Sequence, residues 1–133
     1  YKRFGNVNKL LAGGHAKVIE LLAGRVPNCA RTLSDQFAQA WQLESAVKRL
    51  GLEIEVEQRP RAESDTAVAA ASILAREEFI DWIDAQSKKL GTPLPKGAGA
   101  QVIETGRELV SRMGDGILPD IAKMHFRTSS EVM

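Results

Sequence analysis

Residues 52–57 alternate apolar and acidic side chains, and this short stretch restricts the fold of the chain more than any other. A period of two places the leucine, isoleucine and valine on one face and the glutamates on the other, as in a β-strand with one face in solvent. Gly51 precedes the stretch and Arg59-Pro60-Arg61 follows it, and both interrupt regular structure. We therefore expect a half-exposed strand that needs a neighbouring strand and a covering layer.

Helical patterns precede this strand. Asn6 or Asn8 can cap a helix that runs to about Gly24, although each glycine of the pair at positions 13 and 14 costs up to ~1 kcal/mol there. The expected apolar stripe of this helix consists of Leu10, Leu11, Val18, Leu21 and Leu22. A short strand is expected at residues 30–34, followed by a helix at residues 38–50 that Gly51 ends. The core side of that second helix is expected to carry Trp41, Leu43, Val47 and Leu50.

The second half of the chain is expected to be helical. A long helix covers residues 66–90 and ends at Gly91, and residues 91–99 form a loop rich in glycine and proline. Shorter helices are expected at residues 101–113 and 119–125. The polar tail at residues 127–133 is expected to be frayed.

The order helix, strand, helix, strand and then three helices favours an α/β fold, with a partly parallel central sheet and flanking helices. Two short strands rarely form a sheet on their own, because three or more with a covered face are usually needed. The chain also begins with Tyr1 rather than Met. We therefore expect the N-terminal strands of the sheet to be missing from this chain, and an upstream segment or a partner chain to complete it.

Composition narrows the class of protein further. The chain has 133 residues and 44% apolar content, which suits a single globular domain. Cys29 is the single cysteine, so no internal disulfide can form, and we expect a cytoplasmic location. Because no Cys or His cluster accompanies Cys29, we do not expect a zinc site. No apolar run approaches the ~18 residues of a membrane span, so we expect no membrane partner. The net charge is +1, but residues 1–34 hold six Lys and Arg against one Glu; this stretch can meet phosphates or form a solvated helix face.

Three acids are candidates for a metal site. Asp35 follows the first short strand, where ligand sites of open α/β sheets gather, although Ser34 or Asp35 can instead cap the next helix. Glu63 and Asp65 lie between the second strand and the long helix. If the strands are neighbours, these acids come close to Asp35, and carboxylates are the ligands that Mg²⁺ prefers. Acids before a helix also suit its dipole without any metal.

Residues 67–76 form a run of small side chains that ends at Arg76, and the run lets a helix approach its neighbour closely. Arg76 is either a phosphate contact or an ordinary surface arginine, and the same alternatives hold for Lys96 in the Gly-Pro loop. His15 lies within a helix, where a structural role outweighs catalysis. His125 near the terminus either supports a site or packs.

These segments together resemble the ribonuclease HIII family, one of the type 2 ribonucleases H. Residues 34–37 (SDQF) resemble the family's strand end with its acid, and Glu63 followed by residues 68–76 (VAAASILAR) resembles the acid before its alanine-rich helix. Residues 5–16 resemble the helix before that strand, and residues 94–98 and 122–128 resemble the family's last segments. The matches follow one order along nearly the whole chain.

The resemblance implies a partial ribonuclease H-like fold, with residues 1–133 as the C-terminal portion of the nuclease domain. It implies a Mg²⁺- or Mn²⁺-dependent endonuclease that cuts RNA paired to DNA by a two-metal mechanism, with the hybrid as its partner. Of the family's four metal-binding acids, Asp35 matches the third and Glu63 the fourth, with Asp65 as a rival because the link to the alanine run is about a residue short. The first two acids, an Asp-Glu pair on the first strand, have no match here. The chain alone is therefore expected to be inactive.

Two hypotheses of different classes remain. The first is a metal-dependent ribonuclease H, or a portion of one, with Asp35 and Glu63 as catalytic and metal-binding residues and weaker nucleic-acid contacts at Arg76 and Lys96. The second is a catalytically inactive ribonuclease H-like module that binds nucleic acid or protein. An Asp-Glu pair on a strand upstream of Tyr1 would distinguish the enzyme from the module.

Overall fold

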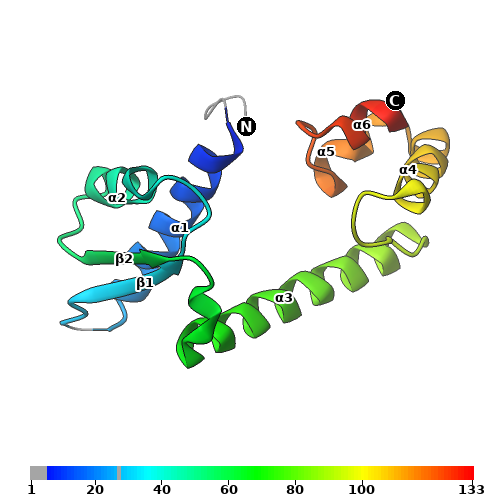
Figure 1. Ribbon diagram of the computed structural model, residues 1–133. Coiled ribbons are helices and arrows are strands. Elements are labelled where there is room, and N and C mark those ends of the chain that lie inside the picture. Colours follow the sequence, from blue (N-terminus) through cyan, green and yellow to red (C-terminus); the bar gives the residue numbers. More distant parts are fainter. Residues whose placement is uncertain (1–5, 27) are drawn as a thin grey trace. The chain divides into compact units, whose positions relative to one another are not determined.

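A computed structural model describes residues 6–26 and 28–133. The chain forms two compact units, Tyr1–Leu74 and Ala75–Met133. Helix α3 (Thr66–Leu90) runs from the first unit into the second (Figure 1). Among the described residues, no helix combines the length and the apolar character that crossing a membrane requires.

The first unit contains two helices and two strands, followed by a short 3₁₀ helix and the start of α3 (Figure 1). Its elements are α1 (Val7–Ala23), β1 (Arg31–Asp35), α2 (Ala40–Arg49), β2 (Glu55–Arg59) and η1 (Ala62–Ser64). The expected alternation of helix and strand is confirmed. Asn6 caps α1, because its side-chain oxygen accepts a hydrogen bond from the N–H of Lys9 at 3.0 Å.

The two strands lie side by side and run parallel, as the α/β prediction required. The register pairs Arg31 with Glu55 and Asp35 with Arg59. Because side chains alternate along a strand, Thr32, Ser34 and their partners face one side of the sheet, and Leu33, Asp35 and theirs face the other. The first of these sides is covered: the Ser34 hydroxyl contacts His15 of α1, and the Gln58 amide donates to the carbonyl of Ala40 at the start of α2.

The core of the first unit lies between α1, α2 and the covered side of the sheet. Its buried residues are Ala12, Ala16, Ile19, Leu43, Ala46 and Val47. The stripe predicted for α1 is wrong, since Leu11, Val18, Leu21 and Leu22 are exposed and Leu10 is half-buried. Apolar residues occupy more than one face of α1, and the face with two alanines is buried because small side chains let α2 approach closely.

The other boundaries differ in detail. Leu43 and Val47 of α2 are buried as predicted, but Trp41 is 57% exposed and Leu50 is 39% exposed. Strand β2 begins at Glu55 rather than at residue 52, because the first residue of β1 in the register, Arg31, pairs with Glu55. Leu52 and Ile54 still pack against the core from the segment before the strand.

The second unit contains the rest of α3, followed by α4 (Ala100–Met113), η2 (Asp115–Ile117), α5 (Leu118–Ile121) and α6 (Arg127–Val132). Helix α5 is shorter than predicted. The predicted frayed tail is wrong, because residues 127–132 form α6 and bury Ser129 and Val132. Helix α6 packs on α4 at Gly106, where an added Cβ would lie 2.8 Å from a methyl carbon of Val132. Sequence periodicity does not reveal this contact, since the tail is mostly polar and Val132 is its buried apolar residue.

Candidate metal-binding site

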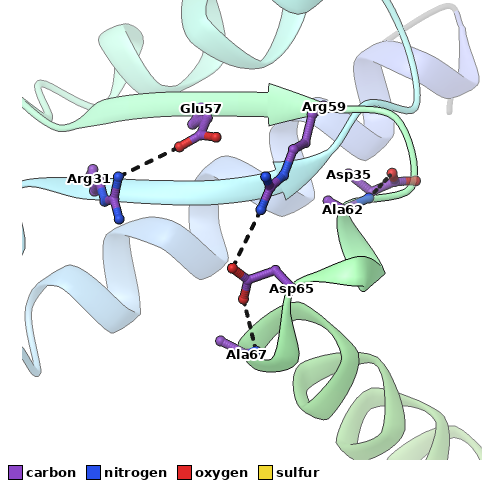
Figure 2. A network of polar contacts seen from close by, with 7 residues as sticks. All are labelled: Arg31, Asp35, Glu57, Arg59, Ala62, Asp65 and Ala67. Carbon is purple, nitrogen blue, oxygen red and sulfur yellow. Dashed lines mark hydrogen bonds and ion pairs between the residues drawn. The ribbon is translucent and has the colours of Figure 1, made fainter.

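The carboxyl ends of the parallel strands carry the candidate site. Asp35 is the last residue of β1, and strand alternation places its side chain on the side of the sheet opposite to α1 and α2. On the same side, Arg31 and Glu57 form an ion pair at 3.9 Å, and Arg59 contacts Asp65 at 3.4 Å (Figure 2). Asp35 is thus an exposed carboxylate at a strand end, in a polar setting.

The backbone of η1 holds the Asp35 carboxylate. Its Oδ1 accepts a hydrogen bond from the N–H of Ala62 at 3.1 Å (Figure 2). This N–H opens the short helix η1, so one oxygen of Asp35 satisfies a free donor and the other remains available to a ligand. The alternative that Ser34 or Asp35 caps the following helix is wrong: α2 begins after Gln39, and no side chain caps it.

The short helix η1 also carries Glu63, directly after Ala62. Glu63 therefore lies between β2 and α3, as expected, on a turn whose backbone N–H at Ala62 donates to Asp35. Its side chain is exposed, and no hydrogen bond or ion pair within the described ranges engages it. The closeness of the Asp35 and Glu63 carboxylates stays a prediction.

Asp65, the rival of Glu63, is already engaged. Its Oδ1 accepts from the N–H of Ala67 at 2.9 Å (Figure 2). Its backbone carbonyl accepts from the N–H of Ala69. Its Oδ2 lies 3.4 Å from a guanidinium nitrogen of Arg59. Asp65 is therefore the N-cap of α3 and an ion-pair partner, so a cation would have to compete with at least one of these interactions.

The donor set fits part of a divalent-cation site. Carboxylate oxygens are the ligands that Mg²⁺ and Mn²⁺ take in proteins, and Asp35 and Glu63 each present an oxygen with no partner among the described residues. Residues 6–26 and 28–133 contain no group of three His, Cys, Asp or Glu side chains able to hold a metal ion.

His15 lies behind Asp35, on the covered side of the sheet. Its Nδ1 is 3.3 Å from the hydroxyl of Ser34, and its ring centroid is 4.7 Å from that of Phe37. Burial lowers the pKa of His15 below its ordinary value of 6.5, and the charge of Asp35 opposes this shift in part. The structural role expected for His15 fits these contacts, but their location beside Asp35 has no signal in the sequence.

The two candidate phosphate contacts belong to the second unit. Arg76 lies on α3 and Lys96 in the loop between α3 and α4, and both side chains are exposed. Lys96 also lines a pocket of about 630 Å³ whose wall is mostly apolar and includes Trp82 and Leu109. Their exposure suits contact with a large charged ligand and equally suits simple solvation.

The parallel strands, the helices on one side of them and the carboxylates at their carboxyl ends define an α/β protein with a candidate cation site. The family model for Ribonuclease HII matches residues 2–129. The chain therefore belongs to the ribonuclease HII family.

Similar proteins agree with this assignment. Ribonuclease HIII of Protochlamydia amoebophila is 43% identical over 133 residues, and Ribonuclease HIII of Chlamydia pneumoniae is 42% identical. The crystal structure of Bst-RNase HIII in complex with Mn²⁺ matches 98% of this chain with a TM-score of 0.88 and 29% identity. The chain spans 44% of that structure, and 44% and 45% of the two relatives. The predicted resemblance to ribonuclease HIII and the partial α/β fold it implied are confirmed.

Proposed function

We propose that the full-length protein cleaves the RNA strand of RNA–DNA hybrids as a cytoplasmic ribonuclease HIII, and that this chain is the C-terminal portion of its ribonuclease H-like nuclease domain. Support comes from the family match and from relatives named Ribonuclease HIII. The relatives are more than twice as long as the matched region, which leaves room for further strands of the sheet and further ligands.

Asp35 and Glu63 are the proposed metal-binding residues, with Mg²⁺ or Mn²⁺ as the cofactor. The observation that carries this assignment is the hydrogen bond from Ala62 N–H to Asp35 Oδ1, because it ties the turn that bears Glu63 to the strand end that bears Asp35. The Mn²⁺ in the Bst-RNase HIII crystal is consistent with a divalent cation here. The capping role of Asp65 favours Glu63 as the ligand.

Asp35 and Glu63, with acids from upstream residues, would hold two cations, which would supply charge neutralisation at the reacting phosphodiester. The role of this chain is to hold two acidic side chains at fixed positions for that chemistry. Upstream residues supply the remaining carboxylates in this proposal. Arg76 and Lys96 contribute positive charge to the binding of the hybrid backbone.

The test uses the full-length protein, a labelled RNA–DNA hybrid and either Mg²⁺ or Mn²⁺. Cleavage should disappear in Asp35→Asn and in Glu63→Gln and persist in the matched control Asp65→Asn, which retains an N-cap. A wild-type protein that binds the hybrid but does not cleave it with either metal would instead identify an inactive binding module. Loss of cleavage in Asp65→Asn together with full activity in Glu63→Gln would exchange the roles of these two acids.

A further inference from the structure

His15 contacts the residues on both sides of Asp35. Its Nδ1 lies 3.3 Å from the Ser34 hydroxyl, and its ring packs against Phe37 with a centroid separation of 4.7 Å. Ser34 is the last buried residue of β1, at 8% exposure, and Phe37 belongs to the segment that leads to α2. One side chain of α1 thus holds the strand end immediately before and shortly after the proposed ligand.

The hydrogen bonds around Ser34 define the direction of this contact. The Ser34 hydroxyl donates to the backbone carbonyl of Asp35 at 3.1 Å, and a hydroxyl has one hydrogen to donate. In that arrangement its contact with His15 has to be made as an acceptor. The Nδ1–H of His15 therefore donates to Ser34, which donates in turn to the carbonyl of Asp35. This relay requires the tautomer, or the charged form, with a proton on Nδ1.

The relay and the Asp35 carboxylate lie on opposite sides of the sheet. Ser34 faces α1, whereas Asp35 faces the open side, where Ala62 N–H binds its Oδ1. His15 therefore approaches β1 from the side opposite to the Asp35 carboxylate, which favours a positioning role over a role as a ligand. Its contacts instead restrain the backbone from one side while Ala62 restrains the side chain from the other.

We propose that His15 is a positioning residue that orients Asp35 for cation binding through the hydroxyl of Ser34. This inference rests on the proposed function, since it requires Asp35 to be a ligand. Groups one step removed from a metal set the orientation of its ligands, and their loss typically costs about 10- to 100-fold in metal affinity. The hydrogen bond from Ser34 to the backbone carbonyl of Asp35 restrains the orientation of Asp35 in the same way.

Three variants of the full-length protein separate the two roles of His15, the ring contact with Phe37 and the hydrogen bond to Ser34. His15→Phe keeps a ring against Phe37 and removes the donor. His15→Asn is the matched control, because its amide nitrogen lies near the position of Nδ1 and still donates. Ser34→Ala breaks the relay and leaves the histidine in place. Mn²⁺ is the probe: the free ion is counted by its electron paramagnetic resonance signal, and cleavage is measured against Mn²⁺ concentration.

The proposal expects His15→Phe and Ser34→Ala each to raise the Mn²⁺ concentration at half-saturation by roughly tenfold. His15→Asn should remain within about threefold of the wild type. The double variant of His15→Phe and Ser34→Ala should bind Mn²⁺ no more weakly than either single variant, because both substitutions break the same relay. At saturating Mn²⁺ the cleavage rate should recover in every variant, which a generally disordered protein would not do.

Asp35→Asn distinguishes the two ways in which the proposal can fail. If it abolishes site-specific Mn²⁺ binding while His15→Phe and Ser34→Ala leave it unchanged, His15 is purely structural and the proposed function stands. Equal loss in His15→Asn and His15→Phe would overturn the role of the donor. If Asp35→Asn changes neither Mn²⁺ binding nor cleavage, the proposed metal site itself fails. Circular dichroism confirms folding, and Ser34→Ala carries the test if His15→Phe does not fold.

Discussion

The Asp35 carboxylate accepts a hydrogen bond from the backbone N–H of Ala62, 27 positions further along the chain, at 3.1 Å. This contact joins the end of β1 to η1 and brings the residue that precedes Glu63 to the proposed ligand. A strand end, a turn and a helix start meet here. The predictions on Asp35 and Asp65 test the strand end and the helix start, and the prediction on His15 tests the helix α1 that packs behind the strand end.

Asp35→Asn in the full-length protein should remove far more activity than stability. Asn retains an oxygen that can accept from Ala62 N–H. If the carboxylates of Asp35 and Glu63 are close, as the proposed site requires, the loss of one negative charge also relieves repulsion in the metal-free state. The melting temperature should be unchanged or slightly raised. Metal-dependent cleavage should fall by more than roughly 100-fold, beyond the cost typical of outer-shell partners of a metal. Calorimetry and hybrid cleavage on the same preparation check both; a large drop in melting temperature would make Asp35 mainly structural.

Asp65→Ala should instead lower stability more than activity. The substitution removes the N-cap of α3, which costs about 1 kcal/mol in the free energy of unfolding. The exposed ion pair with Arg59 adds little to this loss. Asp65→Asn should restore most of the stability because Asn caps a helix about as well as Asp. Urea unfolding measures both variants, and the capping role is wrong if Ala and Asn have the same effect.

The metal-free protein should lose stability at mildly acidic pH through His15. Burial lowers the pKa of its imidazole below 6.5, so the folded state binds fewer protons than the unfolded state. This contribution to stability is present above pH 6.5 and is lost as the pH falls through the folded-state pKa. The charge of Asp35 reduces the effect, since it raises the same pKa. Denaturant unfolding measures the free energy of unfolding at several pH values between 8 and 5. This free energy should fall less steeply with decreasing pH in His15→Asn than in the wild type. The same pH dependence in both proteins would contradict this origin.

Gly106→Ala should destabilise the second unit. The new Cβ would lie 2.8 Å from one methyl carbon of Val132 and 3.0 Å from the other, and a β-branched side chain has little freedom to move away. Overpacking typically costs 1–3 kcal/mol, against a gain of up to ~1 kcal/mol in helix propensity, so the net loss is about 1 kcal/mol. The double variant Gly106→Ala with Val132→Ala should recover at least part of this loss. Thermal unfolding of the double variant is compared with that of Gly106→Ala and of Val132→Ala. The contact is absent if the destabilisation in the double variant equals the sum of those in the two single variants.

The isolated 133-residue chain should not cleave an RNA–DNA hybrid at an appreciable rate. Two carboxylates cannot provide the near-octahedral oxygen coordination that Mg²⁺ demands at two sites. The purified chain is incubated with labelled hybrid and Mg²⁺ or Mn²⁺, beside the full-length protein as the positive control. Robust cleavage that Asp35→Asn abolishes would show that the chain is sufficient by itself.

Local patterns predicted the elements well where they were unambiguous. Helix α3 spans Thr66–Leu90 as expected, because its interior lacks Gly and Pro and Gly91 follows it in the left-handed region at φ 64°. The parallel pairing of two strands also followed from the order of elements. The buried face of α1 was predicted wrongly, because its leucines and alanines both repeat at helical spacing and the closeness of α2 selects between them.

The sequence by itself determined the longer helices, the presence of two strands, the family resemblance and the three acids that could form a site. Each of these depends on side-chain periodicity or on residue order, which are local properties of the chain. Only the tertiary structure decided that Asp65 caps α3, that Ala62 binds Asp35 and that His15 reaches Ser34. The last two join residues 27 and 19 positions apart. Contacts of that kind arise from how strands and helices pack, and a carboxylate next to a helix looks the same in sequence whether it caps a helix or binds a cation.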